Sequence, residues 1–417
     1  MTLFNELTLP CGQTLKNRFV KAAMEENLAE ADQSPGNALK KLYAKWAQGG
    51  AGLIITGNVM VDRFAMTGPG GVALEHSTPL DEFERWAKVS KQNNTKVIMQ
   101  INHPGRQVFK KMGGKVLSPS NVALNMGKHS GLFVQPKAMT EDEIFDVIGR
   151  FVTTASRAKD AGFDGVEIHA AHGYLISQFL SPLTNRRDDK WGGDLDYRTR
   201  ILFDVVKKVR EACGQAFIVA VKLNSADFQR GGFDTGDAIY VVKKLSAMNV
   251  DLIELSGGSY EAPAMQGKSG DERTLSREAY FLEFAKRIAE HATVPVMVTG
   301  GIKRYSVAQD VIDSGIELIG MASALAYEPD LINKWQTDKS RLGTIPNITW
   351  KDKTLSGLAN MALVKRQLRR IGSGKTTKFD ASGLFTLIMG QIRQSILTKR
   401  YRRNVIDKGE HKVVTDL

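Results

Sequence analysis

The amino-acid sequence predicts a (β/α)8 barrel, in which eight parallel strands alternate with helices along the chain. Short apolar runs of the length of buried strands recur eight times before residue 340, and amphipathic helical patterns separate them. A barrel of this size accommodates eight such units with some long loops. A doubly wound open sheet is the alternative. It fits less well, because an open sheet would concentrate Gly and polar residues at one switch point, whereas here they follow almost every strand.

The predicted strands are short and rich in Val, Ile and Leu. They are expected at residues 17–24, 53–58, 96–102, 165–169, 217–223, 251–256, 295–299 and 317–321. Residues 1–16 precede them and alternate apolar with turn residues around Pro10 and Gly12, which predicts an N-terminal hairpin.

Helical spacing of apolar residues predicts the connecting helices. They are expected at residues 37–48, 79–93, 140–161, 197–213, 237–248, 277–291, 306–313 and 329–335. The first ends at Gly49-Gly50, which is a C-terminal stop signal. The longest non-helical segments, residues 68–77, 103–135 and 256–274, all follow strands. We therefore expect them on the carboxyl face of the barrel, where they would shape a substrate site.

Basic residues are concentrated at the end of the chain. Residues 341–417 contain 16 Lys and Arg against 5 Asp and Glu, whereas residues 1–340 contain 41 against 40. The sequence therefore predicts a barrel over residues 1–340 and a basic, mainly helical extension over residues 341–417. Helical patterns in the extension fall at residues 358–371 and 384–397, and a basic cluster at residues 399–403 follows the second.

Two roles suit this extension, and a third does not. A basic helix that covers the barrel or forms a subunit contact comes first, and a homo-oligomer is expected. A weak contact with an anionic membrane surface comes second, because an apolar helix stands beside the basic cluster. Nucleic-acid binding is not expected, since basic residues alone are not a recognition module.

The composition limits the class of protein further. The chain is 42% hydrophobic and 24% charged, as in soluble globular proteins, and no apolar run approaches the roughly 18 residues of a membrane span. The N-terminus lacks the pattern of a secretory signal, so a cytoplasmic location is expected. Cys11 and Cys213 are too few for an iron–sulfur cluster or a four-cysteine zinc site, and they do not indicate a disulfide scaffold.

Two glycine-rich turns follow the last two predicted strands. Gly300 and Gly301 come after the seventh strand, and Gly320 with Met321 ends the eighth. Glycines let backbone amides approach an anion, and a helix that follows points its positive end at it, which indicates a phosphate site. The alternative is that these glycines only allow tight turns.

Two polar residues, Gln100 and Lys222, interrupt otherwise apolar strands. A buried Lys needs an anionic or carbonyl-rich partner. Either Lys222 forms a salt bridge inside the barrel, with Glu167 or Asp227, or it contacts a cofactor oxygen.

Three ring side chains, His169, His172 and Tyr174, follow the fourth strand. Chemistry in a parallel α/β fold lies at the carboxyl ends of strands. Two imidazole donors side by side suit a carbonyl, carboxylate or phenolate oxygen, and a tyrosine beside them can protonate carbon. A metal site is not expected, because no acidic or third histidine ligand stands beside the pair.

Several segments together resemble the Old Yellow Enzyme family of FMN-dependent oxidoreductases. HAAHGYLISQFLSPLTNRRDDKWGG, which starts at His169, is close to the signature of members with a histidine pair. The similarity also covers LKNRFVKAAM, LIITGN, VIMQINHPGR and VKLNSADF at the first, second, third and fifth strands. It continues through the SGG at Ser256 and the VTGGI and IGMASAL loops, and it spans residues 1–335 in the expected order.

The resemblance implies an FMN across the mouth of the barrel. The residues implied to contact it are Ala23, Met24, Glu25, Asn58, Gln100, Lys222, Gly300, Gly301, Gly320 and Met321. The glycine loops and Met321 would hold the phosphate through their backbone, Gln100 and Lys222 would contact the pyrimidine end, and the residues after the first two strands would line the isoalloxazine. Lys222 stands where many relatives have Arg.

The resemblance also implies the reaction. NADH or NADPH would give a hydride to FMN, and flavin N5 would pass it to the β-carbon of an α,β-unsaturated carbonyl compound. His169 and His172 would hold the carbonyl oxygen, and Tyr174 would supply the proton. A demethylase or dehydrogenase on the same barrel and a non-catalytic flavin-binding sensor or partner protein are the alternatives.

Three residues depart from the family pattern. Relatives commonly have Pro where Ala23 stands, Cys or Thr touching flavin O4 where Glu25 stands, and Arg near the phosphate where Met321 stands. An ionised Glu25 aimed at the ring would lower the flavin potential, whereas a Glu25 turned outward would pair with Arg or Lys. The larger relatives with an iron–sulfur cluster need more cysteines, so electrons are expected directly from a nicotinamide.

Overall fold

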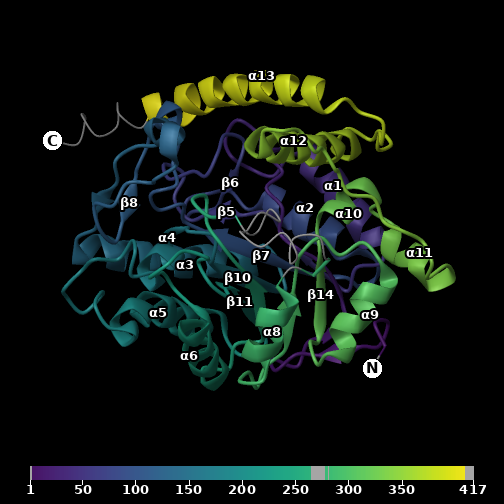
Figure 1. Ribbon diagram of the computed structural model, residues 1–417, viewed down its shortest axis with the longest axis horizontal. Helices are drawn as coiled ribbons and strands as arrows, with labels where there is room; N and C mark the ends of the chain where they lie inside the picture. Colours follow the sequence, from purple (N-terminus) through teal and green to yellow (C-terminus); the bar gives the residue numbers. More distant parts are fainter. Residues whose placement is uncertain (1, 264–277, 280, 409–417) are drawn as a thin grey trace.

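Eight parallel strands close into a barrel in the computed structural model, which describes residues 2–263, 278–279 and 281–408. The strands are β3 (Phe19–Lys21), β4 (Leu53–Ile55), β7 (Lys96–Asn102), β10 (Gly165–Ala170), β11 (Ile218–Asn224), β12 (Leu252–Ser256), β13 (Val296–Val298) and β14 (Leu318–Met321). Each pairs with the next in this order, and β14 returns to β3, so that the barrel is continuous (Figure 1). The predicted (β/α)8 architecture is confirmed, and all eight predicted strands overlap these.

Helices follow the strands around the barrel. They are α1 (Asn37–Gln48), α2 (Asp81–Ser90), α3 (Glu141–Asp160), α4 (Leu175–Leu180), α5 (Leu195–Cys213), α6 (Thr235–Ala247), α8 (Leu282–Ala289), α9 (Tyr305–Asp313), α10 (Ser323–Tyr327) and α11 (Leu331–Thr337). Local sequence sets their ends: Thr140 and Glu143 form a reciprocal capping box at the start of α3. The helices α4 and α10 were not predicted. The predicted helix at 277–291 begins outside the described residues.

The N-terminal hairpin closes one end of the barrel. The strands β1 (Leu7–Thr8) and β2 (Thr14–Leu15) pair antiparallel, as the sequence predicts. Leu9 and Leu15 are buried against the apolar side chains inside the barrel. The Gln13 side chain donates to the carbonyl oxygen of Asp164, at the amino end of β10. The opposite, carboxyl end is therefore the end at which a site can open.

The inward-facing side chains change from apolar to polar toward the carboxyl ends of the strands. Next to the hairpin the buried cluster contains Val20, Ile98, Ala220, Leu252, Met297 and Leu318. Two residues further along β7, β11 and β12 lie the buried polar residues Gln100, Lys222 and Glu254, and buried Glu167 of β10 is paired with Gln100 in the β7–β10 register. Since side chains alternate between the faces of a strand, polar residues two positions on face inward too. The strands thus bring ionisable groups together below the barrel mouth.

Short strands and single turns structure the loops at this end. The 3-10 turn η1 (Gln92–Asn94) directly precedes β7 and lies at the opposite, amino end. The elements at the carboxyl end are β5 (Val59–Met60), β6 (Val72–Ala73), β8 (Leu117–Ser118), β9 (Lys137–Ala138) and the 3-10 turns η2 (Lys110–Met112) and η3 (Gly127–Leu132). Two of the three long predicted loops, at residues 68–77 and 103–135, lie there. The third, residues 256–274, is described only as far as residue 263.

The C-terminal extension is helical, as predicted. It consists of α12 (Lys353–Gly372), α13 (Gly383–Tyr401) and the π-turn η5 (Arg402–Ile406). Leu368 and Ile371 of α12 join the main hydrophobic core, and α12 packs on α1 and α10. The helix α13 packs on α12 and lies across the top of Figure 1, away from the N-terminus. The division at residue 340 remains a prediction.

Candidate active site

The three predicted ring side chains meet at the end of β10. His169 is the fifth residue of this strand and is buried. The rings of His169 and His172 lie 5.0 Å apart between centroids and nearly perpendicular, and the ring of Tyr174 lies 4.8 Å from that of His169. The grouping that the sequence predicts is therefore present in space.

Three hydrogen-bond contacts fix His172. Its backbone N–H donates to Asn224 Oδ1 at the end of β11 (3.0 Å), and its ring Nε2 lies 2.8 Å from Ser256 Oγ at the end of β12. Its carbonyl oxygen accepts from Gln107 Nε2 (3.0 Å). The φ of His172 is 61°, which is uncommon for a residue with a side chain. Backbone held in such a region needs support from its surroundings, and these contacts supply it.

Both histidines are neutral at physiological pH. Burial holds the pKa of His169 well below its usual value, and His172 and the Lys222 charge lower it further. Burial and Lys222 also depress the pKa of His172. Nδ1 of His169 accepts the Ala171 N–H (3.3 Å), so the ring proton of His169 sits on Nε2. A neutral imidazole with a fixed tautomer is a donor that needs no protonation step.

Tyr174 keeps its phenolic proton and has a second tyrosine beside it. Burial, with Tyr260 next, raises the pKa of Tyr174 well above its ordinary value. The two hydroxyl oxygens lie 3.4 Å apart. Sequence reasoning missed Tyr260, although it stands only two residues beyond the Gly257-Gly258 turn in a loop that was expected to shape the site.

Lys222 and Gln100 are both held by carboxyl groups inside the barrel. Lys222 Nζ lies 2.5 Å from Glu254 Oε1, and Gln100 Nε2 donates to Glu167 Oε2 at 2.6 Å. The expected barrel salt bridge thus exists, but the expected partners, Glu167 and Asp227, were wrong. Glu254 is the partner because it is the residue paired with Lys222 in the β11–β12 register.

The second carboxyl group shares this buried layer. Burial, then the neighbouring Glu254, raises the pKa of Glu167 well above its usual value, and Lys222 only partly opposes this. The protonated form of Glu167 is therefore favoured. Among the four buried polar residues Gln100, Glu167, Lys222 and Glu254, the charge of Lys222 is then balanced by that of Glu254 alone.

The two glycine sites expected at the phosphate differ in the structure: the first is a turn with positive φ, and the second is a close approach inside β14. Gly300 and Gly301 directly follow Thr299 at the end of β13 and have φ values of 135° and 68°. A side chain at Gly320 would overlap Thr299, since its Cβ would lie 2.2 Å from Thr299 Cγ2. Met321 buries its side chain in the core (1% exposed), so only its backbone can face a ligand.

Glu25 turns toward the C-terminal extension. Lys365 Nζ of α12 lies 2.9 Å from Glu25 Oε2 and 2.5 Å from Asn27 Oδ1, and Thr67 donates to Glu25 Oε1 at 2.7 Å. Burial raises the pKa of Glu25, but the charge and hydrogen bond of Lys365 outweigh it, so the pKa lies below its usual value. Of the two predicted orientations, the structure has the one in which Glu25 pairs with a cation.

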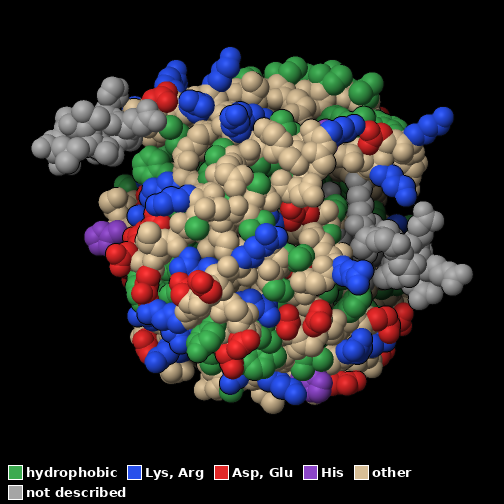
Figure 2. All heavy atoms as spheres, turned by 60° about the vertical axis from the view of Figure 1, so that its left-hand side comes forward, with side chains coloured by type: hydrophobic (Ala, Val, Ile, Leu, Met, Phe, Trp, Pro, Cys, Tyr) green, Lys and Arg blue, Asp and Glu red, His purple; other side chains and the backbone are tan. Residues whose placement is uncertain are grey.

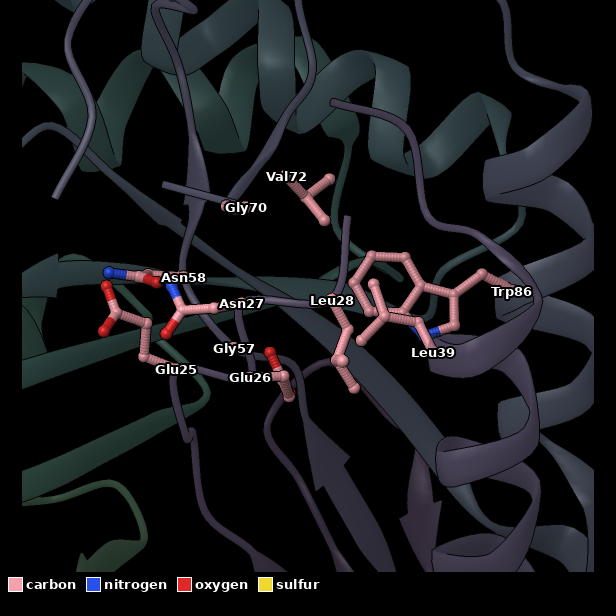
Figure 3. A pocket seen from close by; sticks show the side chains of 11 residues that line it. Glu25, Glu26, Asn27, Leu28, Leu39, Gly57, Asn58, Gly70, Val72 and Trp86 are labelled. Carbon is pink, nitrogen blue, oxygen red and sulfur yellow. The ribbon is translucent and has the colours of Figure 1, made fainter. Parts of the chain in front are cut away.

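A small pocket adjoins Glu25 between the loops that follow β3 and β4 (Figure 3). Glu25, Asn27 and Asn58 gather at one end of it, and Asn58 also donates to Thr67 (3.4 Å). The other end is apolar and contains Leu28, Leu39, Val72 and Trp86. Ala23 and Met24 precede Glu25 and pack against the barrel interior and the main core, respectively.

Comparison with known proteins identifies the family. The family model described as "NADH:flavin oxidoreductase / NADH oxidase family" matches residues 2–341. This chain belongs to that family. It is therefore an oxidoreductase, and the predicted membership of the Old Yellow Enzyme family is confirmed.

Individual relatives agree with this membership. An NADH-dependent flavin oxidoreductase, iliE, of Hypocrea jecorina is 36% identical over 347 residues, which cover 78% of this chain and 86% of that protein. Another, nadA of Aspergillus parasiticus, is 32% identical over 87% of this chain and 86% of that protein. Among solved structures, the old yellow enzyme homologue from Zymomonas mobilis superimposes with a TM-score of 0.71 at 24% identity, covering 85% of this chain and 98% of that one, which shows the same fold.

The residues at the carboxyl end suit a flavin mononucleotide. Gly300 and Gly301 are positive-φ glycines, and no side chain keeps a phosphate away from their backbone amides. Lys222 supplies a buried cation and Gln100 a buried amide, and groups of these two kinds can bind the polar edge of a pyrimidine ring. The His pair lies at the same end. Among the described residues no group of three or more His, Cys, Asp or Glu side chains is arranged to hold a metal ion.

Proposed function

We propose that this protein is an FMN-dependent NAD(P)H oxidoreductase that reduces the activated C=C bond of α,β-unsaturated carbonyl compounds. One observation supports this above the others: the two neutral imidazoles of His169 and His172 are fixed side by side, next to the protonated hydroxyl of Tyr174. Two hydrogen-bond donors and a nearby proton source are what a conjugated carbonyl needs when a hydride reaches its β-carbon.

The family membership suggests which residues would hold FMN. The backbone at Gly300, Gly301, Gly320 and Met321 would bind the phosphate, because the glycines remove side chains there and Met321 points its own side chain into the core. Gln100 and Lys222 would contact the pyrimidine end of the flavin. Ala23, Met24, Glu25 and Asn58 would lie along the ring system. When bound, FMN would supply hydride transfer at N5, with NADH or NADPH as the source.

The substrate would be oriented and activated by the side chains of the site. The Nε2–H of His169 is available to donate because Nδ1 accepts from the backbone of Ala171. His172, held by Ser256, would be the second donor to the same carbonyl oxygen and would stabilise enolate charge. Tyr174 would deliver the proton to the α-carbon and recover it through the neighbouring hydroxyl of Tyr260.

Single-site variants test this assignment. His172→Ala should lower the rate of 2-cyclohexenone reduction by about 10²-fold or more, and Tyr174→Phe by a similar factor, since positioned donors and proton sources contribute effects of this size. The rate at which NADH or NADPH bleaches the bound flavin is measured in the same preparations. A proportional loss of both half-reactions would contradict specific roles in alkene reduction, and undiminished enone turnover would contradict the proposal as a whole.

A further inference from the structure

The outward face of α13 is apolar. Leu384, Ile388, Ile392 and Ile396 recur every fourth residue, with Phe385 and Met389 beside them, and these six side chains are between 44% and 60% exposed. A surface helix of a soluble protein normally turns a polar face to solvent. The upper rim of the molecule in Figure 2, where α13 lies, accordingly shows a band of hydrophobic side chains.

The inner face of α13 is already occupied. Leu397 and Tyr401 are buried, and the Tyr401 hydroxyl donates to the carbonyl oxygen of Arg63 (2.9 Å). Arg400 donates to the carbonyl oxygen of Ala29 (2.8 Å). The exposed apolar residues therefore do not belong to the face by which α13 packs on the protein. They belong to a helix that is anchored on the loops after β3 and β4 and still presents hydrophobic side chains outward.

The charged residues within α12 and α13 are all basic, although an exposed aspartate stands beside each helix, Asp352 before α12 and Asp380 before α13. Neither α12 nor α13 contains an Asp or a Glu along its whole length. Lys399, Arg402 and Arg403 are exposed at the end of the apolar stripe, and Lys351 is exposed before α12. Apolar side chains flanked by cations are complementary to the acyl chains and phosphates of an anionic bilayer.

A contact parallel to the membrane suits the helix lengths. Within the part of the chain that the structure describes, no helix is both long and apolar enough to cross a bilayer. The neighbouring helix α12 widens the apolar area, since Leu355, Leu358 and Met361 are also exposed. Such a surface would insert only to the level of the headgroups.

We propose that α13, with the exposed start of α12, docks this protein on an anionic membrane surface. The six apolar side chains of α13 enter the interface, and Lys399, Arg402 and Arg403 contact lipid phosphates. Because α13 rests on the loops after β3 and β4, docking holds the carboxyl end of the barrel toward the membrane. This inference is independent of the proposed reaction.

Vesicle co-sedimentation of the full-length chain tests the proposal. Vesicles of phosphatidylcholine mixed with phosphatidylglycerol are compared with vesicles of phosphatidylcholine alone, and Ile388→Glu/Ile392→Glu is compared with Leu342→Glu, which changes an exposed leucine outside α12 and α13. We expect the wild-type and Leu342→Glu proteins to sediment with the anionic vesicles and the α13 double variant to lose about tenfold or more in apparent affinity. Lys399→Glu/Arg402→Glu/Arg403→Glu should weaken binding by a similar factor, since each cation near an anionic surface contributes to it.

Several outcomes would overturn the proposal. They are absence of wild-type binding to anionic vesicles, equal binding to phosphatidylcholine alone, and binding that neither α13 variant reduces. The exposed face could instead pair with a second copy of the chain. In that case light scattering would show a dimer that Ile388→Glu/Ile392→Glu dissociates, while the wild-type protein stays in the supernatant with vesicles.

Discussion

Glu254 determines how much positive charge Lys222 presents at the carboxyl end of the barrel. The two side chains lie 2.5 Å apart and are both buried, so the charge of Lys222 is largely balanced within the protein. The other acid of this layer, Glu167, favours its protonated form. A bound flavin near Lys222 would therefore interact with a cation that is already paired with a carboxylate. Such a cation stabilises negative charge on the reduced flavin ring less than an unpaired cation would.

Removing the carboxylate at position 254 should raise the flavin potential. Glu254→Gln keeps the shape of the side chain and removes the carboxylate bound to Lys222. Burial, the larger cause of the raised pKa of Glu167, remains, so that Glu167 stays protonated, the Lys222 charge is unbalanced and the reduced, more negative flavin is favoured. A gain of about 1.4 kcal/mol would appear as an increase of about 30 mV for a two-electron couple. Dye equilibration of the FMN-loaded proteins measures it, with the exposed Glu283→Gln as the matched control. A potential that is unchanged or falls would contradict this account of the pair.

His103 gives the protein an acid-sensitive site outside the His pair. Burial lowers its pKa from 6.5 to about 4, and its Nδ1 accepts the N–H of Gly105, which requires a deprotonated nitrogen. Because the folded-state pKa is the lower one, the unfolded chain takes up the proton first as the pH falls. The stability contributed by His103 is full above its unfolded pKa and decreases as the pH drops from about 6.5 toward about 4.

Denaturant unfolding at several pH values checks this prediction. At about 1.4 kcal/mol per unit of pKa difference, His103 should account for a loss on the order of 3 kcal/mol between neutral pH and its folded pKa. His103→Asn retains an acceptor for Gly105 without an imidazole and should make this part of the pH dependence shallower, while the buried His169 and His172 keep their share of it. The same slope in both proteins would assign the acid sensitivity to other groups.

At the scale of elements, α12 brings a side chain from the extension to the loop after β3. Lys365 binds both Glu25 and Asn27, so the extension takes part in the electrostatics of the pocket rather than only covering the barrel. It keeps Glu25 ionised in spite of burial. Because Glu25 is paired with Lys365, it does not present an unpaired carboxylate to the flavin ring, which is the other orientation predicted from the sequence.

Lys365→Met should therefore expose an ionisation of Glu25 that the wild-type protein does not show near neutral pH. Without the lysine, burial raises the pKa of Glu25 toward neutrality, and the flavin absorbance should change with pH between about 5 and 8. The double variant Lys365→Met/Glu25→Gln should lose this dependence. Lys375→Met, an exposed lysine beyond α12, serves as control. Spectra that are independent of pH in the Lys365 variant would show that the pair does not reach the flavin.

The positions of elements could be predicted from sequence better than contacts between them. The bounds of α1 agree with the predicted helix because Gly49-Gly50 ends it, and the strands follow from their apolar runs. The Glu25–Lys365 pair joins residues 340 positions apart, and no local pattern indicates it. Likewise Glu254 lay in a predicted strand, but its pairing with Lys222 depends on the register of β11 against β12.

At the scale of the whole molecule, the two ends of the barrel have different roles. The hairpin seals the amino end with Leu9 and Leu15, and the carboxyl end collects His169, Lys222 and the glycine turns. The extension lies on this second end through contacts with the loops after β3 and β4. The molecule is thus polarised, with stability at one end and the candidate chemistry at the other.

The visible absorbance spectrum of the purified protein under anaerobic conditions tests the central claim most directly. The account predicts a flavin spectrum that bleaches when NADH or NADPH is added and returns when 2-cyclohexenone follows. Together these changes would establish the cofactor, the electron donor and the reduction of an activated alkene. A colourless protein that FMN does not reconstitute, or a bleached flavin that the enone cannot reoxidise, would contradict the proposed function.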